Sequence, residues 1–178
     1  LLVKAHQKLN TLDRCAELLI NSLSNASYVP TVASELGARW DQATASALLS
    51  AIDKAGVGSD KAYAKAYLHG VVCQELSEFD QAEEYYHQSV TFNPQFVPAY
   101  LAWGNLLLAE RRWSEVVKLA DQALATNPSI GGLLYLKGRA LSELDKLPEA
   151  IKTLEDATKQ TPQSDQIYLA LAEAYLRN

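Results

Sequence analysis

Three histidines, two cysteines and a pair of glutamates are the side chains in this sequence whose types could support chemistry. His6, His69 and His87 are scattered along the chain. Glu83, Glu84 and His87 fall on one or neighbouring faces at helical spacing, which could begin a metal site. A metal centre needs further ligands, and a solvated helix face explains this cluster more simply. We therefore expect no catalytic residues, no metal site and no cofactor.

The cysteines and the glycine-rich segment also lack the context that reactive sites need. Cys15 and Cys73 each lie among apolar residues at helical spacing, where a free cysteine behaves as a small hydrophobic residue. A disulfide is the less favoured alternative, and reduced thiols would favour the cytoplasm without fixing the location. The segment 56–58 follows no predicted strand and lacks the Lys-Ser or Lys-Thr pair of a phosphate-binding loop, so we interpret it as a linker. Asn25 begins a glycosylation pattern that matters only in a secreted protein.

Charge and hydropathy narrow the classes of partner. The 178 residues include 16 Lys and Arg against 21 Asp and Glu, a formal net charge of −5, which disfavours nucleic acid. No apolar run approaches the roughly 18–20 residues that cross a bilayer, so we expect no membrane insertion. The chain begins at Leu1 and contains no methionine. We therefore expect it to be a segment of a longer or processed protein.

The chain is organised as a repeat of 34 residues. The elements of this repeat must position any functional side chain. Prolines and glycines recur at this interval, at Pro94, Pro128 and Pro162 and at Gly70, Gly104 and Gly138. Each period predicts two helices. In the last complete period, residues 130–144 have helical apolar spacing, Asp145 and Lys146 form a turn, and Pro148 suits the first turn of a second helix that runs to about Lys159.

The pattern of bulky and small residues within each period resembles the tetratricopeptide repeat family. One period supplies the family signature at Tyr100, Trp103, Gly104, Leu107, Val116, Ala120, Ala123 and Pro128. Departures are Lys137, where Leu is usual, and Val116, where Ala is usual; both are expected to affect local packing only. Small residues at helix crossings permit close approach, so we interpret the signature residues, and His69 among them, as packing positions.

The resemblance implies an all-α fold, a right-handed α-solenoid of antiparallel helix pairs with about five repeats. We expect a regular array over residues 60–178, with repeats near 63–96, 97–130 and 131–164 and a half repeat at 165–178. Residues 1–59 are expected to form irregular helical repeats, with helices at about 12–24 and 41–55 and a longer loop at 56–60. Gly131 and Gly132 are expected to form a loose helix entry.

A second apolar stripe on the first helix of each repeat is not used by the signature packing. Residues three or four apart on this stripe face one way, and the 34-residue period adds their equivalents. In tetratricopeptide repeat proteins these positions line the concave inner surface, so the resemblance implies a partner-binding groove. The alternative is that these side chains pack against neighbouring helices. The candidate groove residues are Tyr67, Val71, Leu101, Asn105, Leu108, Tyr135, Arg139, Leu169 and Glu173.

The expected function is therefore a scaffold or adaptor that binds a peptide or protein segment, and not an enzyme. The alternative is a substrate-recognition arm of a larger enzyme whose catalytic domain lies outside this segment. The Lys and Asn clamp by which related co-chaperones grip a C-terminal carboxylate is missing, and Asn105 and Arg139 are the candidate donors. Arg139 is expected to orient an acidic or C-terminal group. The last helix, with Leu169 and Leu176, leaves an apolar face that predicts self-association or contact with further repeats.

Overall fold

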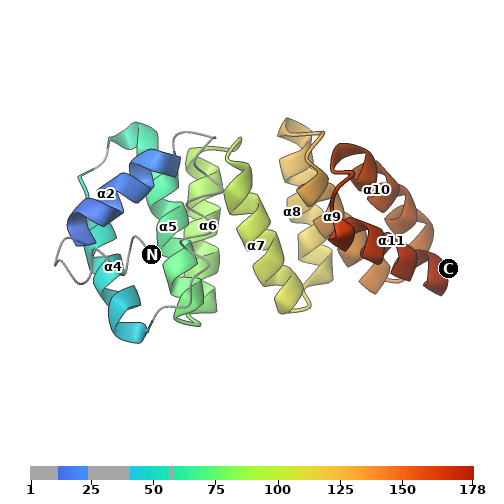
Figure 1. Cartoon of the computed structure of the whole chain (residues 1–178), viewed down its shortest axis with the longest axis horizontal. Helices are drawn as coiled ribbons and strands as arrows, with labels where there is room; N and C mark the ends of the chain where they lie inside the picture. The colour runs from blue at the N-terminus through green and yellow to red at the C-terminus, as the bar shows by residue number, and fades with distance from the viewer. Residues whose placement is uncertain (1–11, 24–40, 57) are drawn as a thin grey trace. The chain divides into compact units, whose positions relative to one another are not determined.

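The computed structural model describes residues 12–23, 41–56 and 58–178, and helices are the only regular elements in these ranges. His6 and the glycosylation pattern at Asn25 lie outside the described residues. The helices α2 (Leu12–Leu23) and α4 (Gln42–Lys54) agree with the ranges expected from the sequence (Figure 1). The helix α4 begins where the Asp41 side chain accepts a hydrogen bond of 2.8 Å from the Thr44 backbone N–H.

The chain divides into two compact units, which we call unit 1 (Leu1–Asn93) and unit 2 (Pro94–Asn178). Besides α2 and α4, unit 1 contains a 3₁₀ turn (Ser59–Lys61) and the helices α5 (Ala62–Glu75) and α6 (Phe79–Phe92). The helices α5 and α6 lie side by side as an antiparallel pair (Figure 1). This division falls inside the regular array expected over residues 60–178. The boundary expected near residue 60, between irregular and regular repeats, stays a prediction from the sequence.

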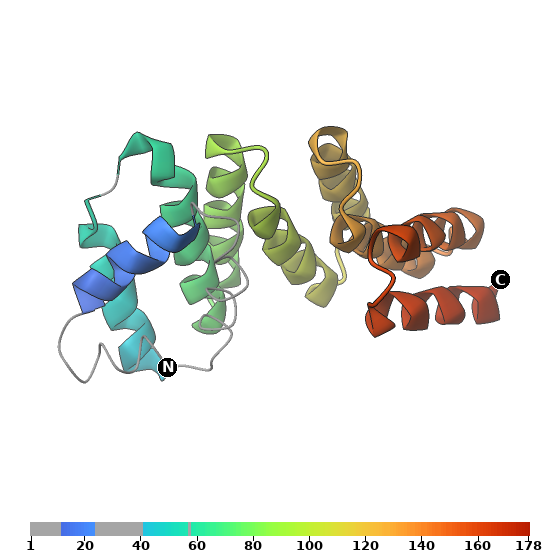
Figure 2. The same ribbon diagram turned by 45° about the horizontal axis from the view of Figure 1, so that its top comes forward.

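Unit 2 continues the helix pairs. It contains α7 (Val97–Ala109), α8 (Trp113–Thr126), α9 (Gly131–Glu143), α10 (Leu147–Gln160) and α11 (Asp165–Arg177). In Figure 2 the helix α11 lies alongside α10, and both helices also contact α9. Leu154 of α10 packs with Ala170 and Ala174 of α11, so small residues let these two helices approach closely.

The same turn closes the first helix in three consecutive repeats. Ser77, Arg111 and Asp145 have φ angles of 63°, 60° and 60°, and they are the described non-glycine residues with positive φ. The residue after each one donates its backbone N–H to a carbonyl five residues earlier, as Lys146 does to Leu141 at 3.0 Å. These bonds satisfy carbonyl groups that the helix end would leave unpaired. The antiparallel pairing therefore rests on a left-handed residue at one fixed place in the repeat.

Close helix approach explains the repeated glycines. A Cβ on Gly70 would lie 2.6 Å from the Tyr86 ring, and one on Gly138 would lie 2.5 Å from Leu154 Cγ. Tyr86 and Leu154 occupy the same position of their repeats, so both glycines accommodate the second helix of their own pair. Gly131 is the first residue of α9, as expected of a helix entry, but this entry is not loose. Gly131 is buried, and a Cβ there would overlap the Thr161 side chain.

Candidate protein-binding surface

Three of the residues that could have carried chemistry, His69, Cys15 and Cys73, are buried. His69 is buried, its ring is stacked on Tyr85 with centroids 4.7 Å apart, and its Nε2 lies 2.8 Å from Asp53 Oδ1. Both cysteines are buried, and neither forms a disulfide bond. Burial is the main cause that raises the pKa of the Cys73 thiol to about 11. A thiol with a raised pKa is a poor nucleophile at neutral pH.

Among the described residues, no three His, Cys, Asp or Glu side chains are grouped closely enough to hold a metal ion. None of the helices formed by these residues has the length and apolar character needed to cross a membrane.

In unit 1, the two candidate groove residues lie on α5. Tyr67 is 6% exposed, and its ring centroid lies 6.1 Å from that of Tyr86 on α6. Burial raises the pKa of the Tyr67 hydroxyl to about 12. Val71, one turn later, is half-buried. Tyr67 therefore belongs to the interior of the α5/α6 pair and offers little surface to a partner.

In unit 2, α7 carries three of the candidate residues at its surface. Asn105 is exposed, whereas Leu101 and Leu108 are half-buried. Leu101 packs close to the start of α9, where a Cβ on Gly132 would lie 3.1 Å from Leu101 Cδ2. The stripe on α7 is therefore partly covered by the next helix pair and partly open.

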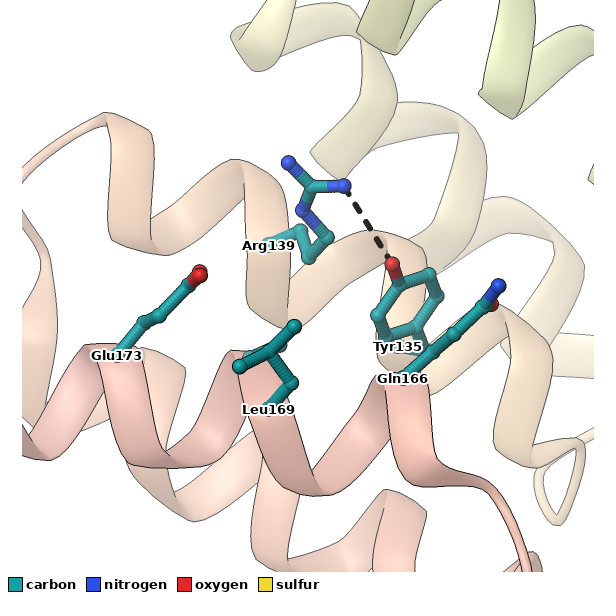
Figure 3. A pocket seen from close by; sticks show the side chains of 6 residues that line it. Tyr135, Arg139, Gln166, Leu169 and Glu173 are labelled. Carbon is teal, nitrogen blue, oxygen red and sulfur yellow. Dashed lines mark hydrogen bonds between the residues drawn. The ribbon is translucent and has the colours of Figure 1, made fainter.

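The remaining four candidates meet at a surface hollow of about 170 Å³ between α9 and α11, which we call the α9/α11 hollow. Its walls are formed by Tyr135, Arg139, Gln166, Leu169, Ala170 and Glu173. Figure 3 shows Gln166, Leu169 and Glu173 projecting from α11 on the side where Tyr135 and Arg139 project from α9. The residues on α11 are three and four positions apart, so they share one face of that helix.

Arg139 and Tyr135 form a fixed arrangement at one side of this hollow. Arg139 Nη1 donates a hydrogen bond of 3.4 Å to the Tyr135 hydroxyl, and the guanidinium carbon lies 5.9 Å from the ring centroid (Figure 3). A guanidinium near an aromatic ring gains cation–π attraction. Most of its five N–H donors remain available, because the contact with Tyr135 uses only one of them.

The other side of the hollow combines an apolar side chain with an anion. Leu169 is 62% exposed, and Glu173 is exposed one turn further along α11. The candidate groove residues named from the sequence did not include Gln166 or Ala170. Gln166 lies three residues before Leu169 on the same face of α11, so the helical spacing of the stripe could have identified it.

The helix α11 exposes further large side chains. Tyr168 and Tyr175 lie on a different face from the hollow, whereas Leu176, which is 88% exposed, lies seven residues after Leu169 and on the same face as Leu169. Tyr175 donates a hydrogen bond of 2.5 Å to Glu155 of α10, and this bond is the main cause that raises the pKa of its hydroxyl. Arg177 donates a hydrogen bond of 3.2 Å to Ser142 of α9. The end of α11 is therefore tied to both α9 and α10.

Comparison with known proteins supports this description of the fold. Residues 107–175 match the sequence model of the tetratricopeptide repeat family, which confirms the resemblance read from the signature residues. This stretch begins in α7 and ends in α11, so it spans the α9/α11 hollow. No curated protein sequence matches the chain. Tetratricopeptide repeats generally serve as non-catalytic scaffolds for other proteins.

Solved structures extend the similarity beyond the matched repeats. The tetratricopeptide domain of Arabidopsis OM64 superposes with a TM-score of 0.63 at 15% identity, covering 68% of this chain and 100% of that domain. MamA from Desulfovibrio magneticus RS-1 gives a TM-score of 0.64 at 16% identity, covering 75% of this chain and 76% of that one. MamA from AMB-1 covers 92% of this chain and 89% of its own, with 17% identity and a TM-score of 0.59. At these identities the similarity establishes a shared helical-repeat fold.

Proposed function

We propose that this chain is a scaffold or adaptor that binds a peptide or protein segment at the α9/α11 hollow. The observation that carries the proposal is the grouping of Tyr135, Arg139, Leu169 and Glu173 around one hollow. An aromatic ring, an exposed leucine and two opposite charges are the anchoring and orienting groups typical of recognition surfaces. Candidate residues on α7 would extend contacts with a longer segment, with Asn105 as a hydrogen-bonding group.

Leu169 supplies the apolar anchor in this proposal. It is one of the few large apolar side chains in the described residues that remain mostly exposed, and it lies between groups that can orient a ligand. Covering an exposed leucine removes apolar surface from water, which favours association by about 25 cal/mol per Å² buried. A partner side chain that covers Leu169 would therefore be apolar.

Arg139 orients the ligand in this proposal. In the part of the chain that the structure describes, no carboxylate forms an ion pair with Arg139, and its guanidinium is positioned by Tyr135. An arginine of this kind pairs well with a carboxylate, either an acidic side chain or a C-terminus. Glu173 on the facing helix would repel that carboxylate and attract a basic group. The ligand would therefore bind in one direction.

The proposal can be tested by selecting displayed peptides on the purified protein and measuring their affinities for variants by calorimetry. Leu169→Ala should weaken a selected peptide at least tenfold, because the apolar anchor is lost. Phe92→Ala provides a matched control, since Phe92 is 59% exposed on α6 and lies outside the hollow. Equal affinities of the wild type and Leu169→Ala, or equal losses in both variants, would reject the hollow as the binding site.

The exposed side of α11 supports self-association as a second candidate function. Tyr168 and Tyr175 are exposed, whereas Tyr100 and Leu107, at the same repeat positions on α7, are buried. Light scattering over a concentration series should show a dimer that Tyr168→Lys weakens, because a charge would replace an apolar contact. A monomer at all concentrations would contradict self-association and leave the peptide-binding proposal unaffected.

A further inference from the structure

A second and larger hollow lies between α9 and α10, apart from the residues proposed to bind a protein segment. Its volume is about 310 Å³, which is within the range of sites that accept small ligands or single side chains. Leu134 and Leu141 of α9 form its apolar part, and Lys137 and Thr153 line it from the two helices. Glu149, Lys152 and Asp156 of α10 supply charged groups. We call this space the α9/α10 hollow.

The preceding repeats carry larger side chains at the positions that surround this hollow. One period earlier, Tyr100, Trp103 and Leu119 stand where Leu134, Lys137 and Thr153 stand in this repeat. Tyr100 and Leu119 are buried. Two periods earlier, His69 and Tyr85 occupy the positions of Lys137 and Thr153, and their rings stack with centroids 4.7 Å apart. Both earlier repeats therefore have aromatic rings at these positions, whereas the repeat of α9 and α10 has none.

Specific contacts keep the replacement side chains from filling the space. Lys137 Nζ lies 2.6 Å from Asp121 Oδ1, so its charged end is directed toward α8. The Thr153 hydroxyl donates a hydrogen bond of 2.8 Å to the Glu149 backbone carbonyl, which holds this short side chain against its own helix. The Lys137 departure from the usual Leu thus has a structural consequence.

The polar end of the hollow also has an equivalent in the preceding repeat. There burial raises the pKa of the Tyr100 hydroxyl, and the neighbouring Gln122 side chain offsets part of that rise. Asp156 occupies the position of Gln122 one period later, and its carboxylate lies 2.7 Å from Lys159 Nζ. A phenol bound as the Tyr100 ring is would bring its hydroxyl group near a carboxylate, which is a strong hydrogen-bond acceptor.

We propose that the α9/α10 hollow binds an aromatic side chain, preferentially tyrosine, from a segment of another protein. The missing rings of this repeat define the shape of the ligand, and Asp156 defines its polar end. The inserted ring covers Leu134 and Leu141, which reproduces the packing that Tyr100 and Trp103 provide from within the chain. This site is separate from the α9/α11 hollow, and neither proposal depends on the other.

Titration of the isotope-labelled protein with N-acetyl-tyrosinamide, followed by NMR, tests the proposal. The methyl signals of Leu134 and Leu141 should shift with a Kd in the millimolar range, as expected for a ligand of this size. N-acetyl-leucinamide is the control probe and should bind at least threefold more weakly. Absence of shifts at these methyl groups, or equal binding of both probes, would overturn the proposal.

Filling the hollow from within sharpens the test. The double variant Lys137→Trp, Thr153→Leu restores the residues of the preceding repeat, and it should raise the Tm and weaken the probe at least tenfold. The single variant Thr153→Leu should have a smaller effect in the same directions and replaces the double variant if that one does not fold. Leu169→Ala should leave probe binding unchanged. Undiminished binding to the filled variants, or equal loss in Leu169→Ala, would show that the probe does not occupy this hollow.

Discussion

The helices α5 and α9 show how one repeat position can serve the interior in one unit and the surface in another. Tyr67 and Tyr135 are separated by two periods and so occupy equivalent places. Tyr67 is buried beside Tyr86, whereas Tyr135 is half-buried and accepts a hydrogen bond from Arg139 at the α9/α11 hollow. The repeat pattern assigns the same backbone place to both tyrosines, but not the same role.

The side chain on the second helix explains part of this difference. Tyr86 and Leu154 stand at equivalent places, on α6 and α10. Tyr86 has a ring that reaches Tyr67 and a hydroxyl that donates a hydrogen bond of 2.8 Å to Gln74. Leu154 is shorter, and Tyr135 packs against the edge of its cluster. A large second-helix residue thus draws the first-helix tyrosine into the core, and a smaller one leaves it at the surface.

The largest expected effect separates the two tyrosines by stability. Tyr67→Ala should lower the free energy of unfolding by about 3–5 kcal/mol, because a buried aromatic side chain is replaced by a cavity. Tyr135→Ala should lower it by only about 1 kcal/mol, because that ring is partly solvated. Urea denaturation followed by circular dichroism measures both values. Equal losses would mean that the two positions are energetically the same and would break the comparison.

A second prediction concerns the ionisation of the Tyr67 hydroxyl and its effect on stability at alkaline pH. Burial raises its pKa to about 12, so the folded state keeps a proton that the unfolded chain loses near pH 10. The stabilisation is complete below pH 10 and is lost as the pH rises toward 12. Its size is about 3 kcal/mol for a shift of about two pKa units. The urea concentration at the unfolding midpoint should therefore fall less between pH 10 and 12 in Tyr67→Phe than in the wild type.

Tyr86 also has a pKa raised by burial, so some alkaline loss will remain in Tyr67→Phe. If the midpoints of wild type and Tyr67→Phe fall in parallel, Tyr67 is not the buried phenol described here.

The sequence predicted the helices and their pairing because these depend on local signals that recur every 34 residues. The glycine markers at 70 and 138 have a direct counterpart in the close contacts with Tyr86 and Leu154. The grouping of Arg139 with Glu173 and Leu169 follows from the same period, since neighbouring first helices present equivalent faces. The burial of Tyr67 could not be predicted from the apolar pattern of its own helix, because this burial depends on a side chain of the facing helix.

The hollow between α9 and α10 shows a similar limit. Lys137 was recognisable as a departure from the family pattern, but its direction depends on the ion pair with Asp121 of α8. Thr153 gave no signal by itself, because threonine is unremarkable on a helix surface. The unfilled space becomes apparent only when Lys137 and Thr153 are compared with Trp103 and Leu119, the larger residues at the same positions one period earlier.

The smallest expected effect concerns a feature that the two units share. Ser77 and Asp145 adopt positive φ at the same turn, at a cost of order 1 kcal/mol for residues with a Cβ. Ser77→Gly and Asp145→Gly should each raise the free energy of unfolding by up to about 1 kcal/mol. Similar gains in the free energy of unfolding would support the same turn geometry in both units, although their cores differ. A loss of stability in either variant would contradict the turn geometry.

The most direct test of the central claim measures how Arg139 contributes to peptide binding in unit 2. A peptide selected on the protein, carrying an acidic or C-terminal carboxylate, is titrated calorimetrically into the wild type, Arg139→Ala and Lys146→Ala. Lys146 is an exposed cation of the same repeat outside the α9/α11 hollow, so its removal changes the net charge equally. We predict that Arg139→Ala weakens binding by about 1–3 kcal/mol and that Lys146→Ala changes it little. Equal affinities of all three proteins for the peptide would contradict the account.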